Sequence, residues 1–393
     1  MKKILFMIIN MNVGGTEKAL LNMISEMPRN KFEISILMLE EYGGFLEELP
    51  KDINVKYLDY YTNIKDILND PPQYTVIKMI KKGKVISGIN LLLIHTLSKL
   101  IGERNLFYKY VLKDYPDIVN KYDIAVAYAG PMELITYFVL NKIEADKKIQ
   151  WIHFDIDKCG FNKGASIKNY KLFDKIFVVS KEGKNKLVNK IPEVKEKTQE
   201  FFNIISPKLI VEQANKDNGF ADKYDGFRIL TVGRLTHEKG QDLCIEALRK
   251  LKDEGYNIRW YCVGDGDSRK RYEELVLNNN LVEDFIFLGS KTNPYSFMKQ
   301  CDIYVQPSLH EGYCITLAEA KCFGKPIVTT NFTGAKEQII NRETGIIVEC
   351  NSNDLYEAIK EVIDNSGLRD KISRNVVKTL SDTSNEINKF LKL

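Results

Sequence analysis

The stretch of sequence that decides the fold reads Pro307-Ser308-Leu309-His310-Glu311-Gly312-Tyr313-Cys314-Ile315-Thr316-Leu317-Ala318-Glu319-Ala320. A β-branched and aromatic run precedes it at 301–306, and helix-forming residues end it, so the pattern predicts a strand, a turn and a helix. Glu311 lies in the turn and Glu319 in the helix. An ionised carboxylate only accepts hydrogen bonds, so sugar or ribose hydroxyls are natural ligands for both glutamates. Because N–H groups at a helix start favour an anion, we expect a nucleotide-sugar across this helix N-terminus.

Taken alone, the two glutamates favour a plainer interpretation, in which Glu311 caps the helix and Glu319 is a solvated surface residue. A second segment reverses this balance. Residues 227–240 again predict a strand, a glycine turn and a helix, and they place Arg234 and Lys239 five residues apart at the turn. A guanidinium gives bidentate contacts to phosphate oxygens and an ammonium gives a point charge, so the pair suits a diphosphate.

Four motifs follow one another in the second half of the chain: Val232-Gly233-Arg234-Leu235-x4-Gly240, Val263-Gly264-Asp265-Gly266, Leu288-Gly289, and Pro307-Ser308-x2-Glu311-Gly312-x6-Glu319-Ala320. In this order they resemble the C-terminal domain of the retaining GT-B glycosyltransferases of family four. Near the start of the chain, Gly14-Gly15-Thr16-Glu17 is similar to the first loop of that family.

The resemblance implies an α/β protein of the GT-B class, with two Rossmann-like domains facing each other across a cleft. We expect an N-terminal acceptor-side domain at 1–205 and a C-terminal nucleotide-sugar-binding domain at 206–376. A last helix at 377–393 would pack back on the N-terminal domain, as it does in GT-B proteins.

The resemblance also implies the site residues. The catalytic set is Arg234, Lys239, Glu311 and His153. The substrate-binding set is Gly14, Gly15, Gly264, Tyr313, Cys314, Ile315, Thr316, Glu319 and Asp155. Arg234 and Lys239 would neutralise the diphosphate as charge builds on the leaving group. Glu311 would hold sugar hydroxyls and Glu319 the ribose.

The N-terminal segment predicts a buried strand at 1–9, since its apolar run is shorter than that of a secretory signal and no cleavage site follows. A glycine turn and a helix from about Thr16 come next. Alone, Gly14 and Gly15 fit a tight connection as well as a ligand loop. The resemblance implies that this loop closes over the donor.

Residues 149–155 predict a strand that runs out into a loop, and His153 lies at the carboxyl end of this strand. In an open α/β sheet, side chains at this end point into the ligand-binding crevice. Without further context a plain core or surface histidine is the commoner outcome. The pattern Trp151-Ile152-His153-x-Asp155 resembles the family's sugar-contacting histidine. Asp155 and Lys158 are weaker candidates for acceptor contacts.

Residues 78–113 carry eight basic residues against one acid, Glu103, so this stretch has a net charge of +7 while the whole chain has +4. The basic residues surround the apolar run 89–94 and further apolar residues at near-helical spacing. Basic flanks on an apolar stripe suit a helix lying on an anionic membrane. An ordinary helix packed on the sheet, with solvated lysines, is the plainer alternative.

Composition sets the broad class. With 393 residues, 44% of them hydrophobic and 28% charged, the chain suits two soluble globular domains. Seven cysteines without a C-x-x-C pair indicate neither a disulfide framework nor a zinc ribbon, and favour a reducing cytoplasm. The four histidines show no metal-ligand spacing, so we expect no metal. We also expect no cofactor and no nucleic-acid partner.

With these features, the resemblance implies a metal-independent, retaining glycosyltransferase of the hexosyltransferase type. It would move a sugar from a nucleotide-sugar, a UDP-sugar in our expectation, to a hydroxyl of a glycan or polyprenyl-diphosphate-linked acceptor. The nucleotide-sugar is a co-substrate, and the expected setting is bacterial-type surface polysaccharide assembly at the inner face of the cell membrane. Two alternatives stay open: another GT-B enzyme, such as a phosphorylase or a nucleotide-sugar epimerase, and a non-catalytic nucleotide-binding partner.

Overall fold

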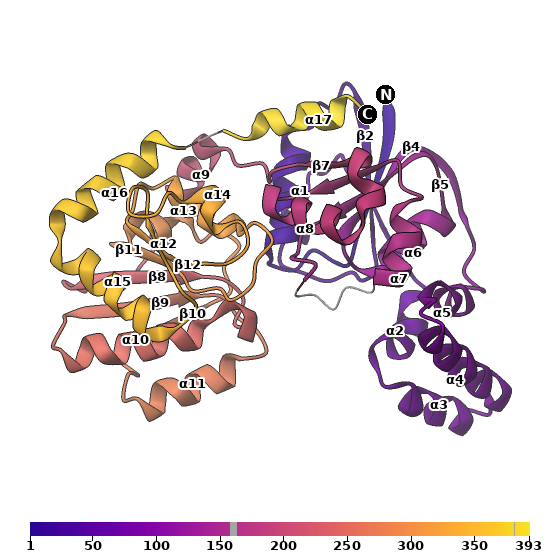
Figure 1. Cartoon of the computed structure of the whole chain (residues 1–393), viewed down its shortest axis with the longest axis horizontal. Helices are drawn as coiled ribbons and strands as arrows, with labels where there is room; N and C mark the ends of the chain where they lie inside the picture. Colours follow the sequence, from indigo (N-terminus) through magenta and orange to yellow (C-terminus); the bar gives the residue numbers. More distant parts are fainter. Residues whose placement is uncertain (158–162, 381) are drawn as a thin grey trace. The chain divides into compact units, whose positions relative to one another are not determined.

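The computed structural model describes residues 1–157, 163–380 and 382–393. The chain divides into two compact units, which are drawn in Figure 1. The first unit consists of Met1–Asn12, Met27–Val178 and Lys184–Glu200. The second consists of Val13–Glu26, Val179–Gly183 and Phe201–Leu393.

The first unit is built on a seven-stranded parallel sheet with the order β3-β2-β1-β4-β5-β6-β7. Its strands are β1 (Lys2–Ile8), β2 (Phe32–Met38), β3 (Asn54–Tyr57), β4 (Ile118–Gly130), β5 (Ile143–Ile152), β6 (Lys175–Val178) and β7 (Thr198–Glu200). Residues 4–8 of β1 are all buried, because a central parallel strand is covered on both faces and therefore reads as a continuous apolar run.

The helices between these strands fall into two groups. Those between β3 and β4 are α2 (Tyr61–Asn69), α3 (Pro72–Lys81), α4 (Val85–Leu100) and α5 (Arg104–Val111). Those after β4 are α6 (Glu133–Lys142), α7 (Lys163–Tyr170) and α8 (Lys181–Lys190). The basic stretch 78–113, for which one surface helix was expected, is therefore divided among α3, α4 and α5. The turns that break it contain Gly83 and Gly102, both with left-handed φ.

The second unit is built on a six-stranded parallel sheet with the order β10-β9-β8-β11-β12-β13. Its strands are β8 (Phe227–Val232), β9 (Ile258–Val263), β10 (Phe285–Gly289), β11 (Ile303–Gln306), β12 (Ile327–Thr330) and β13 (Ile346–Val348). Trp260 and Tyr304 are fully buried in the hydrophobic core of this unit.

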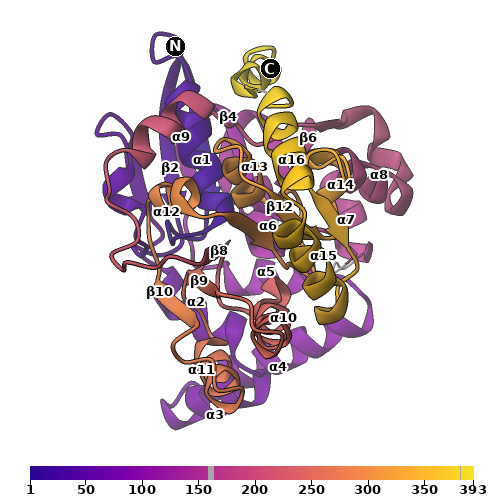
Figure 2. The same ribbon diagram turned by 90° about the vertical axis from the view of Figure 1, so that its left-hand side faces the viewer.

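The helices of the second unit are α1 (Gly15–Glu26), α9 (Pro207–Ala214), α10 (Gln241–Asp253), α11 (Arg269–Asn278), α12 (Tyr295–Gln300), α13 (Ile315–Lys321), α14 (Ala335–Gln338), α15 (Ser352–Asp364), α16 (Ser366–Lys378) and α17 (Ile387–Leu391). Figures 1 and 2 show α10 and α11 on one side of strands β8 and β9, and α9 and α13 on the other. The sheet is thus covered on both faces, as the predicted Rossmann-like arrangement requires.

Strand order in the second sheet reverses at β8: the chain next adds β9 and β10 on one side of β8, and later adds β11 on the other. In open α/β sheets, ligands bind outside the carboxyl ends of the strands at such a switch point. The loops after β8 and β11 are the two that the sequence singled out. The fold therefore brings Arg234 and Glu311 to one place from positions far apart in the chain.

The predicted domain boundaries, with domains at 1–205 and 206–376 and a last helix at 377–393, stay a prediction. The last residues group with the second unit, where the Glu386 carboxylate accepts a hydrogen bond from the Phe202 N–H at 2.8 Å. Thr383 similarly accepts from the Ile205 N–H at 2.7 Å. These bonds tie residues 382–393 to the segment that begins the second unit.

Candidate functional site

The loops that follow β8 and β11 touch because of one glycine. Gly240 caps the short 3-10 helix His237–Lys239 with φ of 67°. A Cβ at this position would lie 2.2 Å from the Pro307 carbonyl oxygen, so only glycine allows this approach. The Leu309 N–H also donates to the Glu238 carbonyl at 2.9 Å. This hydrogen bond and the close packing at Gly240 together fix the position of one loop against the other.

Lys239 and Glu311 form an ion pair between these two loops. The Lys239 Nζ lies 2.6 Å from Oε1 of Glu311, and the side chains are only 18% and 10% exposed. Burial alone would lower the pKa of Lys239, but the Glu311 carboxylate outweighs it and raises the pKa above the ordinary lysine value. Lys239 is consequently a fixed positive charge at neutral pH.

A buried polar network holds the Glu311 side chain in place. The Ser308 hydroxyl donates to Oε1 of Glu311 at 2.7 Å and accepts from the Gln306 amide at 2.9 Å. The Gln306 side-chain oxygen in turn accepts from Tyr304 at 2.8 Å and from Thr316 at 3.2 Å. A carboxylate whose rotamer is locked in this way is preorganised for ligand contact.

Arg234 lies at the same edge of the sheet but is about half exposed. Its Nη2 is 3.9 Å from Glu238, which makes this a weak surface pair. The Gln241 amide donates to the Arg234 backbone carbonyl at 2.8 Å and fixes the turn. The guanidinium is therefore accessible to an anion that arrives from solvent.

Glu319 is not the solvated residue of the plainer interpretation, which is wrong on this point. It is 2% exposed, and its Oε1 accepts a hydrogen bond from the Tyr295 hydroxyl at 2.6 Å. Burial raises the pKa of Glu319, while the nearby Lys18 ammonium and the Tyr295 bond favour the ionised form. The assignment of Glu319 to a ribose stays a prediction.

The first helix of the chain brings Lys18, which the sequence did not single out, and Glu17, which stood in the Gly14-Gly15-Thr16-Glu17 motif without a predicted role. Lys18 on α1 is buried beside Glu319, with its Nζ 5.6 Å from the centroid of the Tyr295 ring. Glu17 folds over Gly14, and burial raises the pKa of Glu17 to about 7, although the Arg234 charge opposes this rise. The glycine turn was the only local sign that this helix contributes to the site. The sequence of a helix start does not show which distant residues it contacts.

Gly14 and Gly15 begin this helix. A Cβ on Gly15 would lie 3.3 Å from the Ile315 side chain, so the glycine turn packs against the start of α13. Ile315 itself is 5% exposed. Gly14 and Ile315 thus lie close to the predicted donor site, whereas their contact with substrate stays a prediction.

Gly264 and Cys314 have backbone conformations that residues with a side chain rarely adopt. Gly264 has φ of 149°, and a Cβ there would lie 1.9 Å from the Gly233 carbonyl oxygen. Cys314 has φ of 39°, an uncommon value for a residue with a side chain. Its sulfur lies 3.4 Å from the Thr316 hydroxyl. Tyr313 presents its backbone carbonyl to the Gln338 amide at 2.8 Å.

His153 directly follows β5 in the first unit. It is 6% exposed, and its ring lies 4.4 Å from that of Tyr128 and stacks on Trp151. Its Nε2 is buried and has no hydrogen-bond partner within the part of the chain that the structure describes. Burial lowers the pKa of His153 to about 3, so the ring is neutral. A buried polar atom without a partner is the kind of group that a ligand satisfies.

Asp155 has structural partners of its own. Its Oδ2 pairs with the Lys186 Nζ at 2.8 Å, and its Oδ1 accepts from the Asp157 N–H at 2.9 Å. These contacts account for its burial without a substrate, and its role in acceptor binding stays a prediction. Lys158, the other acceptor candidate, lies outside the described residues.

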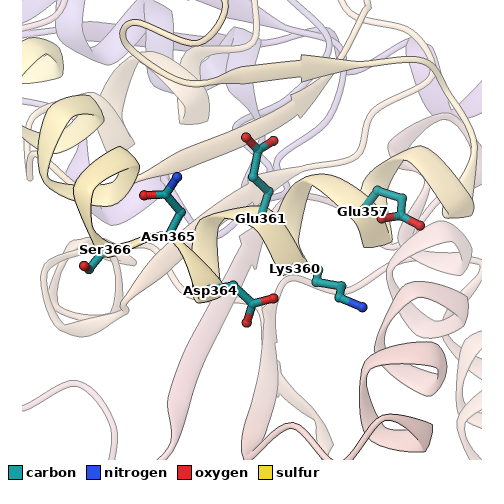
Figure 3. A pocket seen from close by; sticks show the side chains of 6 residues that line it. All are labelled: Glu357, Lys360, Glu361, Asp364, Asn365 and Ser366. Carbon is teal, nitrogen blue, oxygen red and sulfur yellow. The ribbon is translucent and has the colours of Figure 1, made fainter.

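A separate surface depression lies on α15 and at the start of α16 (Figure 3). It is lined by Glu357, Lys360, Glu361, Asp364, Asn365 and Ser366. Lys360 pairs with Glu254, Asp364 accepts from the Tyr256 hydroxyl, and Asn365 caps α16. These side chains are used by the fold, so the depression is no rival to the loops after β8 and β11.

A search of the described residues finds no group of three or more histidine, cysteine, aspartate or glutamate side chains that could hold a metal ion. The charged groups at the switch point instead include two cations, Arg234 and Lys239, and the carboxylate of Glu311, with Glu238 beside Arg234. This set can bind an anion and hydrogen-bond to hydroxyls.

Residues 212–379 match the family model described as "Glycosyl transferases group 1". This segment contains the second sheet and both loops of the candidate site. Residues 212–379 form a glycosyl transferases group 1 domain. The predicted family is thereby confirmed for this domain, whereas its narrower assignment to family four stays a prediction.

Two curated relatives are among the proteins most similar to this chain. An uncharacterized glycosyltransferase of Methanocaldococcus jannaschii is 32% identical over 205 residues, which cover 51% of this chain and 53% of the relative. The Campylobacter jejuni N-acetylgalactosamine-N,N'-diacetylbacillosaminyl-diphospho-undecaprenol 4-alpha-N-acetylgalactosaminyltransferase is 30% identical over 212 residues, which cover 53% and 56%. The matched segments thus span about half the length of these relatives.

Among solved structures, Anabaena HepE in complex with UDP-glucose superposes with a TM-score of 0.71 at 17% identity, over 100% of this chain and 99% of that one. At this level of identity the likeness shows the fold. With two parallel Rossmann-like sheets, it confirms the predicted GT-B class.

Proposed function

We propose that the chain is a glycosyltransferase that moves a sugar from a UDP-sugar to an acceptor hydroxyl, without a metal ion and with retention of the anomeric configuration. The observation that carries the proposal is the placement of Arg234, Lys239 and Glu311 on adjoining loops at the switch point of the second sheet. Two cations and one carboxylate are what a sugar diphosphate needs, because phosphate oxygens take the cations and sugar hydroxyls take the carboxylate.

The charges support a role in departure of the leaving group. As the bond between the anomeric carbon and the diphosphate oxygen breaks, negative charge grows on that oxygen. Arg234 is accessible and Lys239 remains protonated, so both can stabilise this charge without rearranging. Two cations in this position perform the electrostatic task that a bound metal performs elsewhere. This is why we propose a metal-independent reaction.

Retention is proposed from the resemblance to the retaining GT-B family. An inverting transferase needs a general base, and a good base has a pKa near the working pH. His153, the base candidate that the sequence offered, is a weak one, because burial lowers its pKa to about 3. Glu17, whose pKa burial raises to about 7, would be the base of an inverting route. In the proposed front-face route the departing diphosphate, held by Arg234 and Lys239, accepts the proton of the incoming hydroxyl. His153 would then use its unpaired Nε2 to contact the sugar.

Relatives guide the choice of donor and acceptor. Anabaena HepE was solved with UDP-glucose, which favours a uridine nucleotide here. The Campylobacter relative acts, by its name, on a diphospho-undecaprenol glycan, which favours a lipid-linked or glycan acceptor. A capsular polysaccharide biosynthesis glycosyltransferase of Staphylococcus aureus, 30% identical over 168 residues, favours surface polysaccharide assembly as the setting.

The first experiment is a thermal-stability screen with UDP-, GDP- and ADP-sugars in the presence of EDTA. A ligand at about 100 times its Kd adds about 2.7 kcal/mol to the free energy of unfolding, which gives a clear rise in Tm. We expect UDP-sugars to give the largest rise, and incubation with acceptor to release UDP. No rise with any nucleotide-sugar would contradict the proposed donor site. Conversion of the donor to another sugar without an acceptor would identify an epimerase instead.

A further inference from the structure

Exposed apolar side chains are concentrated on one part of the first unit. Of the 22 large hydrophobic side chains that are exposed among the described residues, 12 lie between Tyr74 and Leu106. A soluble surface carries scattered apolar residues, whereas a contiguous set marks an interaction surface. Figure 1 shows α3 and α4, which carry most of these residues, beside each other at the periphery of the unit.

Helix α4 presents an apolar stripe to solvent on the side opposite its buried face. The buried positions are Gly88, Leu91 and Ser98. The stripe consists of Ile86, Ile89, Leu93, Leu97 and Leu100, which recur at intervals of three and four residues and so share one face. Ile86 and Leu100, at its two ends, are 77% and 80% exposed. A contiguous apolar stripe that faces solvent is typical of a surface that contacts protein or lipid.

The turn between α3 and α4 carries three lysines next to this stripe. Lys81, Lys82 and Lys84 are exposed, and none of the ion pairs within the described ranges involves them. Elsewhere in the region, Lys78 pairs with Asp66 and Asp70, and Glu103 pairs with Lys168. Among the described residues, Lys99 in the last turn of α4 also takes part in none of the ion pairs. The hairpin therefore carries uncompensated positive charge at both ends of the stripe, most of it at the tip beside Ile80, Val85 and Ile86.

We propose that the α3–α4 hairpin, residues 72–100, binds to the surface of an anionic lipid bilayer, with the α4 stripe in the acyl boundary and Lys81, Lys82 and Lys84 among the headgroups. A protein partner would also cover apolar residues, but a tip with three unpaired lysines and an all-aliphatic stripe best complements anionic lipid.

The length of α4 sets how it would lie. Its 16 residues span roughly 24 Å, less than the hydrocarbon thickness of about 30 Å. No helix of the described chain is long and apolar enough to cross a membrane. The geometry therefore points to a helix in the plane of the interface.

The test is sedimentation of the full chain with vesicles of equal phosphatidylglycerol and phosphatidylcholine, and with vesicles of pure phosphatidylcholine. We expect binding to the anionic vesicles that weakens as salt rises. Replacing Lys81, Lys82 and Lys84 by Gln should lower the partition coefficient by roughly 100-fold, because each lysine contributes about a 5-fold gain at such a surface. The matched control replaces the exposed Lys208, Lys223 and Lys378 by Gln and should bind as the parent does.

A second readout locates the contact. Leu93→Trp places a fluorophore in the stripe, whereas Leu277→Trp places one on α11 at similar exposure, 64% against 61%. Anionic vesicles should shift the emission of the Leu93→Trp variant to the blue and leave that of Leu277→Trp unchanged. Equal shifts in both variants, binding to neutral vesicles alone, or a salt-insensitive interaction would overturn the proposal. So would a stable oligomer that shields Leu93 and does not sediment with vesicles.

Discussion

Lys239 shows how one side chain is kept ready for its task. A buried ammonium ordinarily loses its proton more easily, but the Glu311 carboxylate 2.6 Å away reverses this tendency and raises its pKa. Removing either partner leaves the other charge buried and unpaired, which is costly. Function and local stability are therefore coupled at this pair.

The first prediction concerns the two cations. Arg234→Ala and Lys239→Ala should each lower kcat/KM by about 100-fold or more, because each removes a positive charge from the departing diphosphate. Steady-state kinetics with a UDP-sugar and circular dichroism check activity and folding together. The control is Arg249→Ala on α10, an exposed arginine paired with Asp253, which should behave like the parent. Near-parental turnover of either site variant would remove that residue from the mechanism.

The second prediction separates the sugar from the nucleotide. Glu311→Gln retains the size of the side chain but replaces one acceptor oxygen by a donor. We expect it to weaken UDP-sugar binding more than UDP binding, since the hydroxyls of the sugar are what the carboxylate accepts from. Isothermal titration calorimetry with both ligands measures the difference. Glu361→Gln, far from the switch-point loops in sequence, is the control, and equal losses for both ligands would mean that Glu311 does not touch the sugar.

The third prediction is a pH dependence. His153 has a pKa of about 3 in the fold, against 6.5 for the unperturbed side chain. Between these values the unfolded chain binds a proton that the folded chain does not, so the free energy of unfolding falls as the pH falls through this window. The contribution of one such group is at most about 1.4 kcal/mol per pH unit. Urea titrations from pH 7 to pH 4 should show a smaller fall for His153→Gln than for the parent.

A matched variant makes this titration specific. His237→Gln changes an exposed histidine and should retain the parental acid sensitivity. If His153→Gln and His237→Gln lose stability with acid identically to the parent, then His153 is not held neutral by burial.

At the scale of elements, the fourth prediction concerns close approach between two strand-end loops. Gly264 has φ of 149° and no room for a Cβ beside the Gly233 carbonyl, whereas Gly255 has φ of 84° and open space around it. Gly255→Ala should cost about 1–2 kcal/mol for backbone strain alone. Gly264→Ala should cost a further 1–3 kcal/mol or so, because the loops must move apart. Urea denaturation measures both, and equal costs would contradict the close packing of these loops.

The strands were predicted from sequence because each is a short β-branched or aromatic run that ends in a glycine or a polar turn. β8 and β11 lie within the two segments, 227–240 and 301–306, in which strands were predicted. β7 was missed, because Thr198-Gln199-Glu200 is three residues long and polar, and only its pairing with β6 makes it a strand. Local pattern does not contain that information.

The candidate site was only partly predictable for the same reason. Motif spacing brought forward Arg234, Lys239 and Glu311, and the sheet topology unites them. The burial of Glu319 beside Lys18 depends on a contact between segments about 300 residues apart in the chain, which no local pattern encodes. His153 likewise gave no sign that its ring nitrogen would be buried among aromatic rings.

At the scale of the whole molecule, the central claim is that this chain transfers a sugar from a UDP-sugar with retention. Three features support this reaction. Arg234 and Lys239 supply two cations for the diphosphate, the hydrogen-bonded Glu311 carboxylate suits the sugar hydroxyls, and His153 is too weakly basic to act as a general base. A covalent intermediate is the one other retaining route. It would need a carboxylate on the far side of the sugar, and Glu311 is its nearest candidate.

The most direct test follows the anomeric proton by NMR while the purified chain acts on an α-linked UDP-sugar, a lipid-linked glycan acceptor and EDTA. The account predicts that the donor signal decays as UDP appears, and that the first new glycoside signal is that of an α-anomer. His153→Ala should slow this reaction without abolishing it. A β-anomeric product, with no turnover by His153→Ala, would contradict the account and make His153 the general base of an inverting enzyme.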